Sequence, residues 1–357
     1  MSKLVSSHKF AELDSLRGIA AMMVVFQHMW EMNHDSDARL KPWLFFCAGH
    51  EAVILFFVLS GFALAHQLRN FSIENYPKFV VKRFLRIYPT YYIAIGFSAI
   101  LLYLISKYLP SSLDGNGLTR WFYIWSSTSF DKQLFISSIT LLSHLGNSLL
   151  VAVWSLFYEM WISLLFPFAL FFLWQSKLFI RIVSMSIFSG ISYYLWQYGQ
   201  FIDNQWQAIV YYSWYFVFGA FLYYMHDKLS IFANIWVLFV GLLCYFSNYI
   251  LFGKINDRFS HELIIGFGSF IILLNGIHNE VFKNVLRSPL LKFYGKISYS
   301  LYLFHLPILY ALSYIILRNY DICLVKILVI PITTLFAYVN FQMCERPFIN
   351  MAKKYFS

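Results

Sequence analysis

One apolar stretch of the chain, LRGIAAMMVVFQH at residues 16–28, begins beside an arginine and ends on a histidine. Arg17 and His28 lie eleven residues apart, a spacing that in an α-helix returns to within about 20° of the same face and rises about 16 Å. A guanidinium binds phosphate or carboxylate oxygens, and a neutral imidazole can take up a proton. The spacing therefore predicts a helix face with a charged group at the inner end and an imidazole farther out.

The residues around this pair favour one shared helix face. Asp14 precedes Arg17 by three residues and can form an ion pair with it on a helix. Ala20 and Ala21 fall between the two functional candidates, so the face is slim there. The alternative interpretation is structural: Arg17 reaches lipid headgroups, and His28 bonds a neighbouring carbonyl group.

A carboxylate interrupts a second apolar stretch, VWSLFYEMWISLLFP at residues 153–167. We expect Glu159 to lie about 9 Å from the outer end of its helix, close to the level of His28. A carboxylate beside an imidazole orients the ring and fixes its tautomer, so Glu159 is the predicted partner of His28. The alternative is a carboxylate at the outer membrane interface that faces water.

Three cations cluster in FVVKRFLRIYP, residues 79–89, just before a predicted membrane boundary. Lys82, Arg83 and Arg86 in this position are typical of a positively charged cytoplasmic anchor. The functional alternative is a phosphate-binding mouth, because arginine can donate two parallel hydrogen bonds to a phosphoryl group.

A second histidine lies in ISYSLYLFHLP at residues 297–307. The predicted helix places His305 about 10 Å from its cytoplasmic end, near the level of Arg17, with Tyr302 one turn earlier. We therefore expect His305 and Tyr302 to join the arginines in binding one ligand. The alternative is a histidine with a purely structural role.

Four further residues are assigned supporting roles. In the motif LFFVLSGF, Ser60 and Gly61 allow a neighbouring helix to approach closely. Asp14 and Trp154 are likewise predicted to support the site rather than to react in it.

Composition places these residues in a membrane protein. Of 357 residues, 60% are hydrophobic and only 12% are charged, whereas soluble domains carry about 25% charged residues. The net charge of +10 is explained by cations in loops rather than by nucleic-acid binding. The four cysteines have no metal-binding or disulfide spacing, so the sequence predicts no metal site. The first apolar stretch contains Asp14 and Arg17 and has no cleavage pattern, which indicates an uncleaved span.

The apolar stretches predict an all-α polytopic membrane protein with about ten transmembrane helices, since each crossing needs about 20 apolar residues. They lie near residues 13–32, 51–69, 88–109, 153–174, 178–197, 208–225, 231–251, 261–279, 298–317 and 322–342. We expect residues 133–150 to be interfacial or re-entrant, and Glu345-Arg346-Pro347 to cap and end the last helix. The prediction is one integral domain over residues 1–357, with a core at 12–348 and no appended soluble domain.

Lysine and arginine positions predict the orientation of these spans. With the N-terminus in the cytoplasm, seventeen loop lysines and arginines lie inside and eight lie outside. Cytoplasmic loops carry the excess of such residues, so we predict that both termini are cytoplasmic.

Six motifs occur along the chain in a recognisable order: Arg17 and His28 with ten residues between them, FFVLSGF, KRFLRIYP, WSLFYE, SYSLYLFH and ERPF. In this order they resemble the acyltransferase-3 family of integral-membrane acyltransferases, over residues 12 to about 348. Enzymes of that family modify bacterial surface polysaccharides, lipopolysaccharide O-antigen, peptidoglycan and nodulation factors.

The resemblance implies an acyl-CoA donor, usually acetyl-CoA, and a carbohydrate or lipid-linked glycan as acceptor. It also implies a multi-pass protein of the bacterial cytoplasmic (inner) membrane with a ten-helix core, and no nucleic-acid partner. The family assigns importance to the residues that match Arg17, His28, Arg83, Arg86 and Glu159. The sequence indicates no oligomeric state.

A mechanism follows if the two predicted depths hold. The residues expected to bind the donor from the cytoplasmic side are Arg17, Arg83, Arg86, Tyr302 and His305. His28 is then the expected general base on the acceptor hydroxyl, with direct transfer and an acylated His28 both open. Two alternatives are a transporter or flippase of envelope glycan precursors, in which the same groups couple to protons, and a structural subunit of an envelope-synthesis complex.

Overall fold

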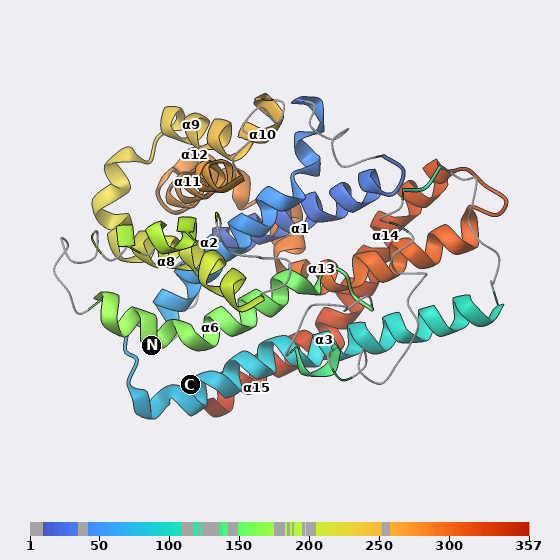
Figure 1. The fold of residues 1–357 in the computed structure, drawn as a ribbon, viewed down its shortest axis with the longest axis horizontal. Coiled ribbons are helices and arrows are strands. Elements are labelled where there is room, and N and C mark those ends of the chain that lie inside the picture. The colour runs from blue at the N-terminus through green and yellow to red at the C-terminus, as the bar shows by residue number, and fades with distance from the viewer. Residues whose placement is uncertain are drawn as a thin grey trace. The chain divides into compact units, whose positions relative to one another are not determined.

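The computed structural model describes residues 10–34, 42–108, 149–174, 205–251 and 258–356, with short pieces between 117 and 141 and between 183 and 197. Every regular element in this described part is a helix, which confirms the predicted all-α class (Figure 1). The chain forms two compact units. Unit 1 comprises Met1–Ala20, Lys41–Ser72 and Tyr158–Gly295, and unit 2 comprises Ala21–Leu40, Ile73–Phe157 and Lys296–Ser357.

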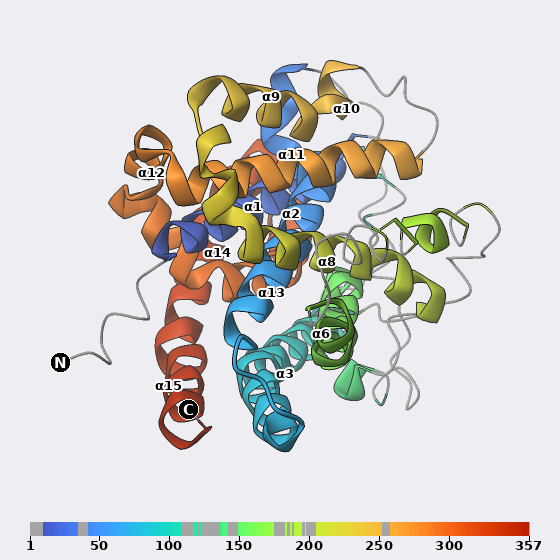
Figure 2. The same cartoon turned by 90° about the vertical axis from the view of Figure 1, so that its left-hand side faces the viewer.

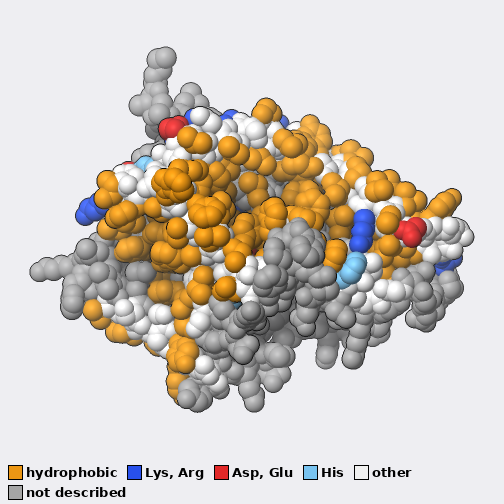
Figure 3. Space-filling view, turned by 90° about the horizontal axis from the view of Figure 1, so that it is seen from above, with side chains coloured by type: hydrophobic (Ala, Val, Ile, Leu, Met, Phe, Trp, Pro, Cys, Tyr) orange, Lys and Arg blue, Asp and Glu red, His pale blue; other side chains and the backbone are white. Residues whose placement is uncertain are grey.

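Seven stretches within the described residues are long and apolar enough to cross a membrane. They are Gly49–Gln67, Ile73–Tyr108, Val153–Leu170, Trp206–Phe232, Phe259–His278, Pro289–Ile316 and Ile322–Tyr355. Hydrophobic side chains cover most of the surface in Figure 3 that the structure describes, as expected of a protein that meets lipid. A polytopic membrane protein is therefore supported.

Three of the ten predicted spans differ from these seven. The stretch at 13–32 forms the helix α1 (Ala11–Glu31). With its ionisable residues, α1 is not among the seven helices that are apolar enough to cross a membrane. The stretch at 231–251 is divided at Phe246 into α9 (Ile235–Tyr245) and α10 (Ser247–Ile250). Half of 178–197 and most of 133–150 lie outside the described residues. Ten spans and cytoplasmic termini stay predictions.

In unit 1, α2 (Gly49–Gln67) packs tightly against α8 (Gln205–Leu229). A Cβ atom added at Gly61 would lie 2.0 Å from the Phe216 carbonyl oxygen, and one added at Gly219 would lie 2.0 Å from the Val58 carbonyl oxygen. Only glycine permits this backbone contact, so the predicted close approach at Gly61 is confirmed. The helix α11 (Arg258–His278) packs on α2, α8 and α9 (Figure 2).

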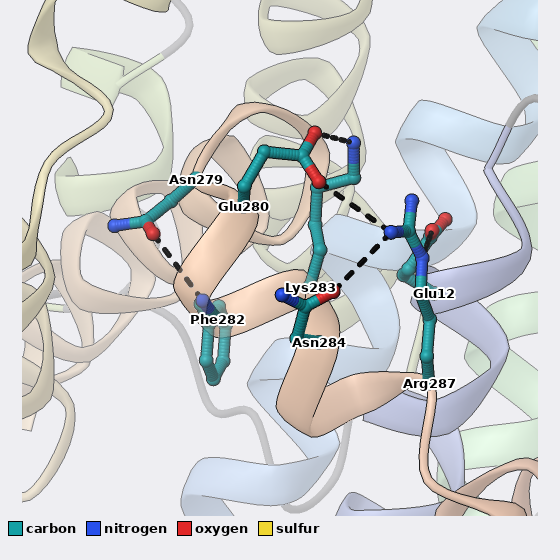
Figure 4. A network of polar contacts seen from close by, with 7 residues as sticks. All are labelled: Glu12, Asn279, Glu280, Phe282, Lys283, Asn284 and Arg287. Atoms are coloured by element: carbon teal, nitrogen blue, oxygen red, sulfur yellow. Dashed lines mark hydrogen bonds and ion pairs between the residues drawn. The ribbon is translucent and has the colours of Figure 1, made fainter.

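Charged side chains tie α1 to α12 (Glu280–Leu286) in the same unit (Figure 4). Arg287 Nε donates to Glu12 Oε1 at 2.8 Å, and Lys283 Nζ donates to Glu280 Oε1 at 2.6 Å. The hydrogen bond from Lys283, with the nearby positive charges, holds the pKa of the Glu280 carboxyl below its usual value. The predicted cytoplasmic cations of this segment are therefore paired with local carboxylates.

In unit 2, two helices extend farther than the sequence predicted. The helix α3 (Tyr76–Tyr108) begins twelve residues before the predicted span at 88–109 and continues through Pro89. The helix α14 (Ile322–Asn340) passes through a π-helical turn (Phe341–Glu345) into α15 (Arg346–Phe356), which packs on α3 (Figure 1). The predicted end at Glu345-Arg346-Pro347 is therefore wrong. The backbone N–H groups in the first turn of a helix have no acceptor within that helix, so a proline there removes no hydrogen bond. Pro347 lies in the first turn of α15 and therefore does not end the helix.

The glycine contact between α2 and α8 predicts the effect of one added methyl group. Gly61→Ala should lower the thermal midpoint Tm of the purified protein in detergent, because overpacking costs about 1–3 kcal/mol, or roughly 2–8 °C. Gly96→Ala on α3 is the control, since no atom of the described residues, apart from the local backbone of α3 itself, lies within 4 Å of an added Cβ there. Alanine is also the better helix former, so the control should keep or raise Tm. Equal Tm values for the two variants would contradict the contact.

Candidate active site

Two histidine rings stack on one another in unit 2. The centroids of His28 on α1 and His305 on α13 (Pro289–Ile316) lie 5.2 Å apart, with an angle of 17° between the ring planes. The prediction that His305 lies near the level of Arg17 is therefore wrong, because His28 is eleven residues past Arg17 on α1. The cause is the start of α13 at Pro289 rather than near 298, which puts His305 about 24 Å along its helix.

The two rings have different hydrogen-bonding environments. His305 is 1% exposed, and its Nδ1 lies 2.6 Å from the Tyr302 carbonyl oxygen. A carbonyl only accepts, so Nδ1 donates, and Nε2 keeps its lone pair. That buried Nε2 has no hydrogen-bond partner among the described residues. His28 Nδ1 lies 3.3 Å from Glu31 Oε2, within ion-pair distance but without the geometry of a hydrogen bond.

Glu31 is a site residue that the sequence analysis did not identify. Its side chain is buried, and its Oε1 accepts a hydrogen bond from Gln27 at 2.9 Å. The signal was present, because residues three apart on a helix face one another and Glu31 follows His28 by three. The carboxylate that contacts His28 in unit 2 thus comes from the same helix.

Tyr302 joins α13 to the first turn of α6 (Val153–Trp174). Its hydroxyl donates to the Ala152 carbonyl oxygen at 2.9 Å and lies 2.6 Å from Ser155 Oγ. The Tyr302 ring lies 5.8 Å from the His305 ring between centroids. Trp154, a predicted supporting residue, is half-buried in the same turn of α6 as Ser155.

The two predicted donor-binding arginines of α3 differ in exposure. Arg83 is buried at 7% exposure, whereas Arg86 is exposed. The guanidinium of Arg86 attracts the carboxylate of Glu345, which is buried in the π-helical turn. Glu345 Oε2 also accepts a hydrogen bond from Ser300 Oγ at 2.7 Å. Asn340 Nδ2 donates in turn to Ser300 Oγ at 2.9 Å. The KRFLRIYP, SYSLYLFH and ERPF motifs therefore meet in one polar cluster.

The remaining predicted site residues lie in unit 1. Arg17 forms the expected ion pair with Asp14, which confirms that prediction. Ala20, the last residue of this part of unit 1, and Ala21, the first of unit 2, are completely buried, so protein covers the slim part of the α1 face. Glu159 Oε1 accepts a hydrogen bond from Ser60 Oγ at 3.3 Å, which connects α6 to α2. The roles of Arg17 and Glu159 in the reaction stay predictions.

Unit 1 also contains a carboxylate cluster that the sequence analysis missed. Glu262 on α11 is fully buried, and its Oε2 accepts hydrogen bonds from the hydroxyls of Tyr211 at 2.7 Å and Tyr215 at 3.3 Å. Its Oε1 lies 3.0 Å from His50 Nε2 at the start of α2. These three partners allow a carboxylate to remain in an apolar interior. The only sequence signal was the position of Glu262 just inside a predicted span.

Comparison with known proteins identifies one family over most of the chain. The family described as "Acyltransferase domain" matches residues 10–340. A protein named "Protein 2 in picA locus" from Rhizobium radiobacter is 36% identical over 112 residues, which cover 30% of this chain and 53% of that relative. "Nodulation protein 10" from Rhizobium leguminosarum bv. viciae is 35% identical over 85 residues, 23% of this chain and 22% of the relative. The chain thus aligns with about half or less of the length of these relatives. No solved structure matches the chain.

The environment of Glu262 predicts a large effect on stability. Glu262→Ala should cost about 3–5 kcal/mol of folding free energy, because it leaves two buried tyrosine hydroxyls and the half-buried His50 without their acceptor. Glu262→Gln should cost less, since it keeps one acceptor oxygen. Glu280→Gln changes an exposed carboxylate on α12 and serves as the control, with little expected effect on stability. Unfolding of the purified protein in detergent measures all three, and a Glu262→Ala protein as stable as the control would contradict the cluster.

Proposed function

The chain belongs to the acyltransferase-3 family of integral-membrane acyltransferases, and on that premise we propose that it moves an acyl group from acyl-CoA to a hydroxyl of a cell-surface or lipid-linked carbohydrate. Acetyl is the proposed acyl group, and the bacterial cytoplasmic membrane is the proposed location. The observation that carries the proposal is the His28–His305 stack with Glu31 beside it. This cluster offers a base, an orienting carboxylate and a neighbouring ring held in one position.

In the proposed reaction, His28 is the general base. With Glu31 ionised, its carboxylate favours the tautomer of His28 that carries the proton on Nδ1 and a lone pair on Nε2. Nε2 takes the proton from the acceptor hydroxyl as its oxygen attacks the thioester carbonyl carbon. The carbon–sulfur bond then breaks, the CoA thiolate leaves, and the proton on His28 passes to that sulfur. The products are the acylated carbohydrate and free CoA.

His305 acts as a positioning residue in this proposal. Its Nδ1 is held by the Tyr302 carbonyl, so its ring gives His28 a fixed surface to stack on. Tyr302 is in turn held by Ser155 and the Ala152 carbonyl. His305 and Tyr302 were predicted to bind the donor. Because His305 stacks on His28, we instead assign both His305 and Tyr302 to the support of the reacting imidazole.

Donor binding is assigned to the cations of α3. The CoA moiety carries phosphates, and Arg86 is an exposed guanidinium on a helix with Arg83 and Lys82 nearby. The part of Arg17 in donor binding stays a prediction from the sequence. The complete burial of Ala20 and Ala21 supports a route for the acyl chain other than the α1 face on which they lie.

The first prediction concerns His28. Inside-out membrane vesicles would receive radiolabelled acetyl-CoA, with wild type, His28→Gln or His34→Gln at matched protein levels. His28→Gln should reduce label in the glycan fraction by about 10²–10⁴-fold, because the general base is lost. His34 is the control, since it is an imidazole near the end of the same helix that stacks on Trp30. Equal label from His28→Gln and wild type would remove His28 from catalysis, and no label from any protein would favour a transporter.

A second prediction separates chemistry from donor binding. Glu31→Gln should lower kcat by about 10–100-fold and leave the KM for acetyl-CoA nearly unchanged, because a charge-assisted contact is worth about 1.5–3 kcal/mol. Arg86→Gln should instead raise the KM for acetyl-CoA by about tenfold, with kcat nearly constant. Steady-state kinetics on purified protein measures both constants. The reverse pattern would contradict the assignment of Glu31 to the reaction and of Arg86 to the donor.

A further inference from the structure

Three side chains of the kinds that bind metal ions lie close together where two helices of unit 1 end. His226 and Asp227 lie in the last turn of α8, and His278 is the last residue of α11. His226 Nδ1 lies 3.0 Å from His278 Nε2 and 3.2 Å from Asp227 Oδ1, and the three atoms fall within 4.8 Å of one another. His226 and His278 are 52 residues apart in the chain, so no sequence motif signals their meeting.

The hydrogen-bonding capacity of these atoms is unbalanced. A carboxylate oxygen only accepts, so Asp227 bonds His226 Nδ1 only when that nitrogen carries a proton. The same nitrogen lies 3.0 Å from His278 Nε2, so a single proton there would face two acceptors. A cation that replaces this proton would receive a lone pair from each of the three atoms.

We propose that His226, Asp227 and His278 bind a divalent transition-metal ion of the Zn²⁺ type. Zn²⁺ binds imidazole nitrogens and carboxylate oxygens at about 2.0–2.2 Å, which in tetrahedral geometry separates the ligand atoms by roughly 3.3 Å. The two contacts of 3.0 and 3.2 Å are close to that value. The site leaves a fourth position for water, and the exposed side chain of Asp227 opens it to solvent.

The position of the site favours a cation independently of its ligands. The last carbonyl groups of an α-helix have no partner within the helix and carry partial negative charge. Two such helix ends, those of α8 and α11, meet at this cluster. His226 is also held in place by an edge-on contact with the Phe10 ring, at 5.7 Å between centroids. A bound ion would join the ends of α8 and α11 on the predicted cytoplasmic side.

Metal binding by the purified full chain in detergent tests the proposal. The protein would be made without a histidine tag, treated with EDTA, and titrated with Zn²⁺ by calorimetry and with Co²⁺ by visible absorption. We expect one equivalent of Zn²⁺ with a Kd of about 1 µM or below, a tetrahedral Co²⁺ spectrum, and a Tm that rises with Zn²⁺ and returns with EDTA.

Substitutions identify the ligands. His278→Gln and Asp227→Asn should each weaken Zn²⁺ binding by at least about tenfold. His66→Gln is the matched control: His66 contacts the same Phe10 ring but bonds Tyr223 and lies outside the ligand group. The Tm without metal shows that each variant is folded. No binding by wild type at about 100 µM Zn²⁺, or an equal loss in His66→Gln and His278→Gln, would overturn the proposal.

Discussion

A polar side chain buried among apolar helices must find its hydrogen-bond partners within the protein, because neither lipid nor a packed core supplies them as water does. Glu262 meets this requirement with two tyrosine hydroxyls and the His50 imidazole. Glu345 meets it with Ser300, and His305 with a carbonyl group of its own helix. Most of these partners come from other helices, so each contact holds only while those helices keep their relative positions. The candidate site therefore depends on the packing that surrounds it.

In unit 1, close approach of helix backbones supplies the packing around Glu262. Gly61 and Gly219 let α2 and α8 touch through their backbones. The same two helices carry His50 and Tyr211 to the Glu262 carboxylate of α11. The glycines and the carboxylate cluster are thus two parts of one arrangement: the first brings the helices together, and the second sets which residues face one another.

The sequence predicted best what depends on neighbours within one helix. The Asp14–Arg17 ion pair follows from a spacing of three residues, and the small residue Gly61 indicates a tight helix contact wherever its partner comes from. The level of His305 was predicted incorrectly because α13 has nine further residues at its N-terminal end, or about 14 Å of helix. Glu262 was missed because His50 is 212 residues away in the chain, and an apolar pattern says nothing about such a partner.

The length of α3 links this protein to the composition of its membrane. Its 33 residues span about 50 Å, whereas the hydrocarbon core of a bilayer is about 30 Å thick. The surplus turns carry Lys78 and Lys82, and the adjoining α15 adds Lys353 and Lys354. Such cations are attracted to anionic headgroups. The immersion depth of α3 is therefore set by lipid charge as well as by bilayer thickness, and a membrane poor in anionic lipid would hold this helix at a different height.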